Sequence, residues 1–83
     1  MGIKEKLIVR LKSIPKDFTF DEMSTALISM GFDISSKGKT GGSRVKFQKD
    51  NIPIFLHRPH NRKELREYQI RQVLEILEKE GLI

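Results

Sequence analysis

The residues best suited to chemistry are two histidines in a strongly basic part of the chain, residues 37–66. This stretch contains nine lysines and arginines against Asp50 and Glu64, so its net charge is +7, whereas the rest of the chain carries −2. Clustered cations displace the counterions condensed on phosphates and so favour nucleic-acid binding. His57 and His60 lie among these cations and can exchange protons near neutral pH. The stretch therefore indicates a nucleic-acid contact surface; the alternative is a solvated surface that keeps a small protein in solution.

The two histidines do not indicate a metal site. They are three residues apart, but the chain has no cysteine and no nearby pair of carboxylates that would complete a ligand set. We therefore expect no metal and no cofactor, and we expect His57 and His60 to have structural or phosphate-contacting roles. The lack of cysteine also excludes a disulfide scaffold, a zinc ribbon and a thiol nucleophile.

Composition limits the size and class of the fold. A chain of 83 residues can build one modest core from two or three helices and a small sheet. Hydrophobic residues make up 37% and charged residues of both signs 33%, which is typical of a folded domain. No stretch is long and apolar enough for a signal peptide or a membrane span. We expect a single cytoplasmic domain over residues 1–83 with no membrane association.

The first predicted helix covers residues 3–12. Ile3, Leu7 and Leu11 recur there at helical spacing, with charged residues between them, and Pro15 prevents the helix from continuing. The apolar stripe could face a membrane surface or a partner. Most such stripes pack on the protein's own core, and we expect that here.

Two further helices are predicted from their end signals. Thr19-Phe20-Asp21-Glu22 forms a capping box, which predicts a helix over residues 20–30 that ends at Gly31. The last helix is predicted over residues 66–80, where apolar residues again recur at helical spacing before Gly81.

Three strands are predicted between these two helices. Phe32 and Ile34 alternate with polar residues, which predicts a first strand over residues 32–37 with one buried face. A glycine-rich turn at residues 38–42 leads into the second strand, residues 43–49.

The second and third strands form a hairpin whose register follows from its turn. Asp50-Asn51 is a favourable two-residue turn, and it pairs Lys46 with Phe55 and Arg44 with His57. The alternation puts Val45, Phe47, Ile54 and Leu56 on one face of the hairpin. We expect these four residues to be buried together with Leu27, Ile70 and Leu74 from the apolar stripes of the helices. Pro53 cannot donate to a ladder, so the third strand should be an edge and the second strand central.

Phe55 shares a face of the hairpin with Arg44 and Lys46. A basic face with one aromatic ring can bind phosphate and stack a base. Alternatively, the ring can lie beneath the first helix. We expect the ring of Phe55 to be covered by the first helix.

From Thr19 to Ile83 the chain resembles the HicA family of toxin-antitoxin proteins. In that family the second strand carries Gly-Ser-His-His with an aromatic residue two positions later, and the third strand leads to Pro-His. The matching segments here are Gly42-Ser43-Arg44-Val45-Lys46-Phe47, Pro59-His60, Lys63-Glu64-Leu65 and Gly81-Leu82-Ile83. The resemblance implies an α+β fold similar to the double-stranded RNA-binding domain, with two helices on one side of a three-stranded antiparallel sheet. Residues 19–83 would form its core, and residues 1–16 an additional N-terminal helical extension.

The resemblance implies a messenger-RNA-cleaving toxin, that is, an endoribonuclease and hydrolase of the mRNA interferase type. It also implies a HicB-type antitoxin that covers the active site. The family's catalytic histidine belongs to the Gly-Ser-His-His element, but Arg44 stands at that position here. Arginine stays protonated and cannot act as a general base. We therefore interpret the chain as an RNA-binding HicA-like toxin with an altered active site; the alternatives are a non-catalytic RNA-binding domain and a protein-docking domain.

The predicted register offers a substitute for the missing histidine. His57 faces Arg44 and could act as general base toward an RNA 2′-hydroxyl, with Arg44 and Lys46 stabilising the phosphorane and His60 assisting. The alternative is a surface histidine without a catalytic role. The residues expected to contact RNA are Lys39, Ser43, Arg44, Lys46, Arg58, Arg62 and Lys63.

Overall fold

A computed structural model describes residues 2–35, 44–59 and 62–83. The helices are α1 (Ile3–Lys12), α2 (Phe20–Ser29) and α3 (Glu67–Lys79), and the strands are β1 (Asp33–Ser35), β2 (Arg44–Lys49) and β3 (Ile52–His57). This is the α+β fold expected from the sequence, and the ends of each helix lie within one residue of the prediction. The predicted turn at residues 38–42 lies outside the described residues. No helix in the described part of the chain is long and apolar enough to cross a membrane.

The second helix begins at the predicted capping box. The backbone N–H of Glu22 donates to Thr19 Oγ1 (3.1 Å), and the N–H of Thr19 donates to Glu22 Oε1 (3.0 Å). Gly31 follows α2 with a φ of 106°, a conformation that favours glycine. The chain then turns directly into β1.

The three strands form one antiparallel sheet in the order β1-β2-β3. The hairpin register is the predicted one: Arg44 pairs with His57, and Lys46 pairs with Phe55. Asp50, with a φ of 51°, allows the tight turn between β2 and β3. As Pro53 indicated, β2 is the central strand and β3 is an edge.

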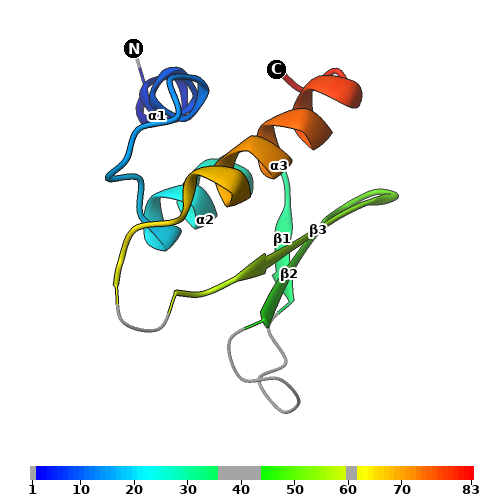
Figure 1. Cartoon of the computed structure of the whole chain (residues 1–83). Coiled ribbons are helices and arrows are strands. Elements are labelled where there is room, and N and C mark those ends of the chain that lie inside the picture. The colour runs from blue at the N-terminus through cyan, green and yellow to red at the C-terminus, as the bar shows by residue number, and fades with distance from the viewer. Residues whose placement is uncertain (1, 36–43, 60–61) are drawn as a thin grey trace.

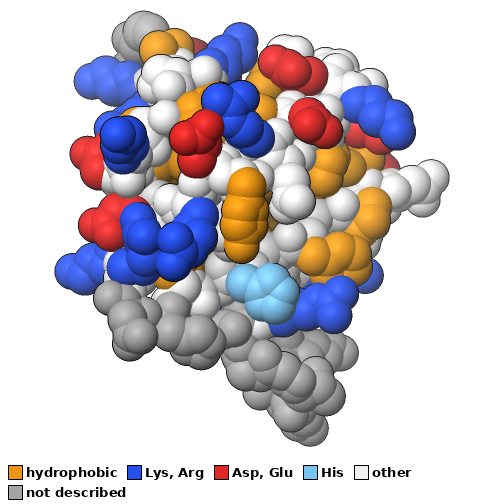
Figure 2. Space-filling model, in the orientation of Figure 1, with side chains coloured by type: hydrophobic (Ala, Val, Ile, Leu, Met, Phe, Trp, Pro, Cys, Tyr) orange, Lys and Arg blue, Asp and Glu red, His pale blue; other side chains and the backbone are white. Residues whose placement is uncertain are grey.

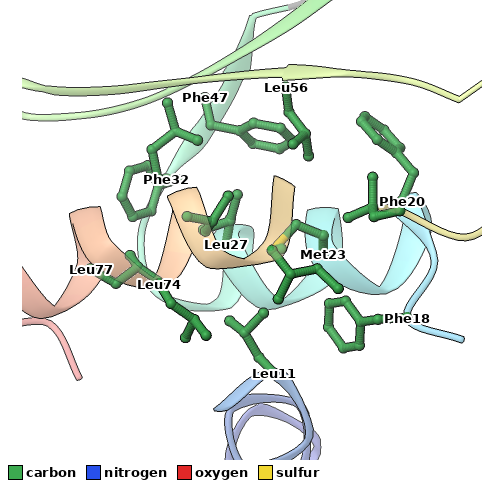
Figure 3. Close-up of a cluster of buried hydrophobic side chains, with 14 of the residues drawn as sticks. Leu11, Phe18, Phe20, Met23, Leu27, Phe32, Phe47, Leu56, Leu74 and Leu77 are labelled. Carbon is green, nitrogen blue, oxygen red and sulfur yellow. The ribbon is translucent and has the colours of Figure 1, made fainter. Parts of the chain in front are cut away.

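The elements are arranged in three layers (Figure 1). Helices α2 and α3 cover one face of the sheet, and α1 lies on the side of these helices away from the sheet. The main core fills the space between the helices and the sheet, where Leu27 of α2 points toward Phe47 of β2 (Figure 3). All seven residues predicted to form the core are buried in one cluster.

Helix α1 is attached to the core by Leu11 and Arg10. Leu11 is fully buried and points toward α2 and α3 (Figure 3). Arg10 Nε donates to Glu22 Oε2 (3.1 Å), and the Arg10 guanidinium lies 5.5 Å from the centre of the Phe18 ring. The hydrogen bond from Arg10 lowers the pKa of Glu22. Because the pKa of Glu22 is lower in the folded than in the unfolded chain, this contact stabilises the fold above the ordinary carboxyl pKa, and its contribution is lost as the pH falls through the lowered pKa. Because Leu11 is buried against α2 and α3, the apolar stripe of α1 packs on the protein's own core, as expected from the sequence.

Two predictions of burial are wrong. Ile34 was expected on the buried face of the first strand, but it is 42% exposed because β1 is an edge strand. Phe32, which directly precedes β1, is buried in the core. Phe55 is 50% exposed rather than covered by the first helix. Since α1 packs on α2 and α3, no helix of the described residues covers the face of the sheet that carries Phe55.

Replacing Phe47 with alanine tests the assignment of the two sheet faces. Phe47 is fully buried at the centre of the sheet, so Phe47→Ala should lower the free energy of unfolding by about 3 to 5 kcal/mol. Val9→Ala is a suitable control because Val9 is 60% exposed on α1, and this change should stay within about 0.5 kcal/mol. Urea denaturation measures both. Equal midpoints for Phe47→Ala and Val9→Ala would show that the faces are assigned the wrong way round.

Candidate functional site

The open face of the sheet carries four of the residues singled out from the sequence. Arg44 and Lys46 project from β2, and Phe55 and His57 project from β3, because side chains alternate between the two faces of a strand. Their neighbours in sequence, such as Val45 and Leu56, are buried in the core. We call these four residues the outer face. Asp33, the acidic residue of β1, pairs with Gln48 at the other end of the sheet from the Arg44–His57 pair.

Both cations of the outer face lie against the aromatic ring of Phe55. Arg44 Cζ is 4.7 Å and Lys46 Nζ is 5.9 Å from the centre of the ring. Cation–π contacts of this kind keep the long side chains on the face while leaving their N–H groups open to solvent. The arrangement can therefore offer both positive charge for a phosphate and an aromatic surface.

His57 lies at the end of β3, directly across from Arg44. Figure 2 shows its exposed side chain in pale blue, as the only histidine among the described residues, with hydrophobic and basic side chains beside it. Paired positions on neighbouring antiparallel strands have Cβ atoms roughly 4.5 to 5.5 Å apart. A phosphate held by Arg44 would consequently lie within reach of the imidazole of His57.

Gln69 of α3 fixes the backbone at His57. Its side-chain amide donates to the backbone oxygen of His57 (3.1 Å), and its Oε1 accepts from the N–H of Arg66 (2.9 Å). The residue is only 8% exposed and is the buried polar residue of the core. Gln69 therefore holds the end of β3 against the start of α3. The sequence analysis missed it, because the usual signal for such a glutamine is a serine or threonine three residues earlier, and Arg66 stands there.

A second group of cations lies where the chain leaves β3. A pocket of about 240 Å³ there contains three cations and one carboxylate, and its lining residues are Thr19, Phe20, Asp21, Arg58, Pro59, Arg62 and Lys63. The guanidinium of Arg58 lies 4.8 Å from the centre of the Phe20 ring. We call this the basic pocket. It is suited to anions, since the positive charges outnumber the negative ones.

The basic pocket is held in place by backbone hydrogen bonds to the start of α2. The N–H of Phe20 donates to the oxygen of Lys63 (3.1 Å), and the N–H of Leu65 donates to the oxygen of Phe18 (2.8 Å). Leu65 is buried between these bonds and α3, so the segment cannot move without opening the core. Arg62 also donates from Nε to the backbone oxygen of Glu64 (3.1 Å).

The structure thus places the predicted site residues in two groups. Arg44, Lys46 and His57 come together on the outer face, whereas Arg58, Arg62 and Lys63 line the basic pocket. The other three predicted residues, Lys39, Ser43 and His60, lie outside the described residues. Within the part of the chain that is described, no three His, Cys, Asp or Glu residues form a group that could hold a metal ion.

Comparison with protein families gave a match that covers most of the chain. The family model described as HicA toxin of bacterial toxin-antitoxin matches residues 20–79, which run from the start of α2 to the end of α3. Helix α1 lies outside the matched region. Comparison with curated proteins and comparison with solved structures gave no significant match.

Replacing Gln69 tests whether it fixes the end of β3. Gln69→Leu leaves the backbone oxygen of His57 and the N–H of Arg66 without their partner, so the free energy of unfolding should fall by about 1 to 3 kcal/mol. Gln72→Leu makes the same chemical change at an exposed position of the same helix and should have little effect. Thermal or urea denaturation compares the two variants. A similar stability for both would contradict this role of Gln69.

Proposed function

Because the chain belongs to the HicA family of toxins of bacterial toxin-antitoxin systems, we propose that it binds RNA through the outer face and the basic pocket. The observation that carries the proposal is the exposed Phe55 ring with Arg44 and Lys46 against it. RNA offers a phosphate backbone to the cations and bases to the ring. The basic pocket supplies three more cations for the same backbone.

Within this proposal the chain is an mRNA interferase with an altered active site. Arg44 occupies the position of the family's catalytic histidine and cannot accept a proton near neutral pH. His57 faces Arg44 from β3 and can take over as general base. It would remove the proton from a 2′-hydroxyl, whose oxygen then attacks the neighbouring phosphorus while the 5′-oxygen leaves.

The cations of the outer face stabilise charge in this reaction. Negative charge grows on the phosphate oxygens as the 2′-oxygen attacks, and Arg44 and Lys46 are placed to offset it. His60 would assist by protonating the leaving oxygen, as an imidazolium can do near neutral pH.

The same arginine favours a second candidate function, a binder that does not cleave RNA. Arg44 strengthens phosphate contact while it removes the family's base, so affinity and catalysis are separable in this chain. In both cases a HicB-type antitoxin would neutralise the protein by covering the outer face. Residues 1–83 would act as one domain, since α1 contributes Leu11 to the same core.

Removing single cations tests RNA binding. Arg44→Ala, Lys46→Ala and Arg62→Ala should each weaken RNA binding and reduce its dependence on salt by about one unit of log–log slope, because each removes a phosphate contact. Lys12→Ala is the matched control, since Lys12 is an exposed cation at the end of α1. Fluorescence anisotropy with labelled RNA at several salt concentrations measures both quantities. RNA affinity unchanged in all three variants would rule out this interface.

A cleavage assay distinguishes the mRNA interferase from a protein that binds RNA without cleaving it. Purified protein is incubated with messenger RNA and a metal chelator, together with His57→Ala, His60→Ala and Arg44→His. An interferase that uses His57 should lose cleavage in His57→Ala by 100-fold or more, the range roughly expected for a general base. Cleavage that survives His57→Ala would eliminate this base. Cleavage that appears only in Arg44→His would identify the natural protein as a binder.

A further inference from the structure

The aromatic residues of the chain fall into two groups. The sequence contains five phenylalanines and one tyrosine. Phe18, Phe20, Phe32 and Phe47 are at most 4% exposed and belong to the core. The remaining two, Phe55 and Tyr68, are 50% and 57% exposed.

The two exposed rings belong to β3 and α3, the elements that Gln69 joins at His57. Phe55 precedes His57 by two residues on the same face of β3, so the two side chains are neighbours along the strand. Tyr68 directly precedes Gln69, whose amide is bonded to the backbone oxygen of His57. Hydrophobic side chains border the pale-blue histidine in Figure 2. Two exposed aromatic rings are thus carried by the two elements that meet where the proposed function needs a nucleotide.

Single exposed apolar residues are common and need no explanation, as Val9 and Ile28 illustrate on the helices. The outer face differs because its exposed ring is combined with cations. Arg44 and Lys46 lie against Phe55, and Asp33, the acidic residue of β1, is at the other end of the sheet. This combination is complementary to a strand whose bases are free to stack and whose phosphates are negative.

We propose that the RNA bound on the outer face is unpaired, and that its bases stack on Phe55 and Tyr68. The inference rests on the proposed function and specifies its substrate. In a duplex the bases are stacked on one another inside the helix, and proteins that read double-stranded RNA contact its phosphates and 2′-hydroxyls. Exposed rings gain little from such a surface. An unpaired strand instead places a base on each ring and its backbone along Arg44 and Lys46.

The absence of tryptophan from the sequence makes the proposal directly measurable. Phe55→Trp and Tyr68→Trp each introduce a single fluorescent reporter on one ring of the site. Val9→Trp is the matched control, because Val9 is equally exposed but lies on α1. Each variant is titrated with an unstructured RNA strand and with the blunt duplex formed by that strand and its complement. The unpaired strand should quench the fluorescence of Phe55→Trp and Tyr68→Trp and leave that of Val9→Trp unchanged.

Affinities of two further variants complete the test. Phe55→Leu and Tyr68→Leu keep an apolar side chain but remove the ring, so each should weaken binding of the unpaired strand about tenfold and leave duplex binding unchanged. A duplex that binds as tightly as the strand, together with unchanged affinity in both leucine variants, would overturn the stacking proposal. If the stacking proposal fails in this way but Arg44→Ala still weakens RNA binding, the proposed RNA-binding function stands without stacking. Failure of the unmodified protein to bind either RNA would overturn both.

Discussion

The register of the β2–β3 hairpin is the constraint on which both the core and the proposed site depend. Side chains alternate along a strand, so a shift of one residue would exchange the two faces of the sheet. With Asp50 and Asn51 in the turn, Phe47 faces the helices and Lys46 faces solvent. The same turn sets Arg44 across from His57. The burial of Phe47 therefore also fixes the positions of the outer-face residues on the opposite side of the hairpin, although these residues contribute little to the core.

The position of the basic pocket depends on a second set of contacts. Backbone hydrogen bonds join Phe18 and Phe20 to the segment that precedes α3, and Gln69 joins α3 to the end of β3. The two helices of the core thus hold both ends of the chain segment that carries Arg58 and Arg62. These backbone contacts limit where the long cationic side chains of Arg58 and Arg62 can reach, even though the side chains themselves are exposed.

Much of this arrangement could be predicted from the sequence, because local rules govern it. The capping box of α2 and the two-residue turn of the hairpin each depend on residues within a few positions of one another. The wrong predictions depend on contacts between distant parts of the chain. The sequence places Phe55 on the face of Arg44, but only the packing of Leu11 against α2 and α3 shows that no helix covers that face. Gln69 was missed for a similar reason, since its partner His57 is twelve residues away.

Helix α1 lies outside the region that matches the HicA family model, yet Leu11 and Arg10 attach it to the core on the side opposite the outer face. The central claim, that RNA binds at the outer face and the neighbouring basic pocket and not on α1, predicts a clear separation between these two sides of the molecule. Amide chemical shifts of the isotope-labelled protein, recorded while RNA is added, measure it most directly. We predict that the largest changes occur at residues 44–46 and 55–58, with α1 unaffected. Changes confined to α1, with β2 and β3 unchanged, would contradict this account.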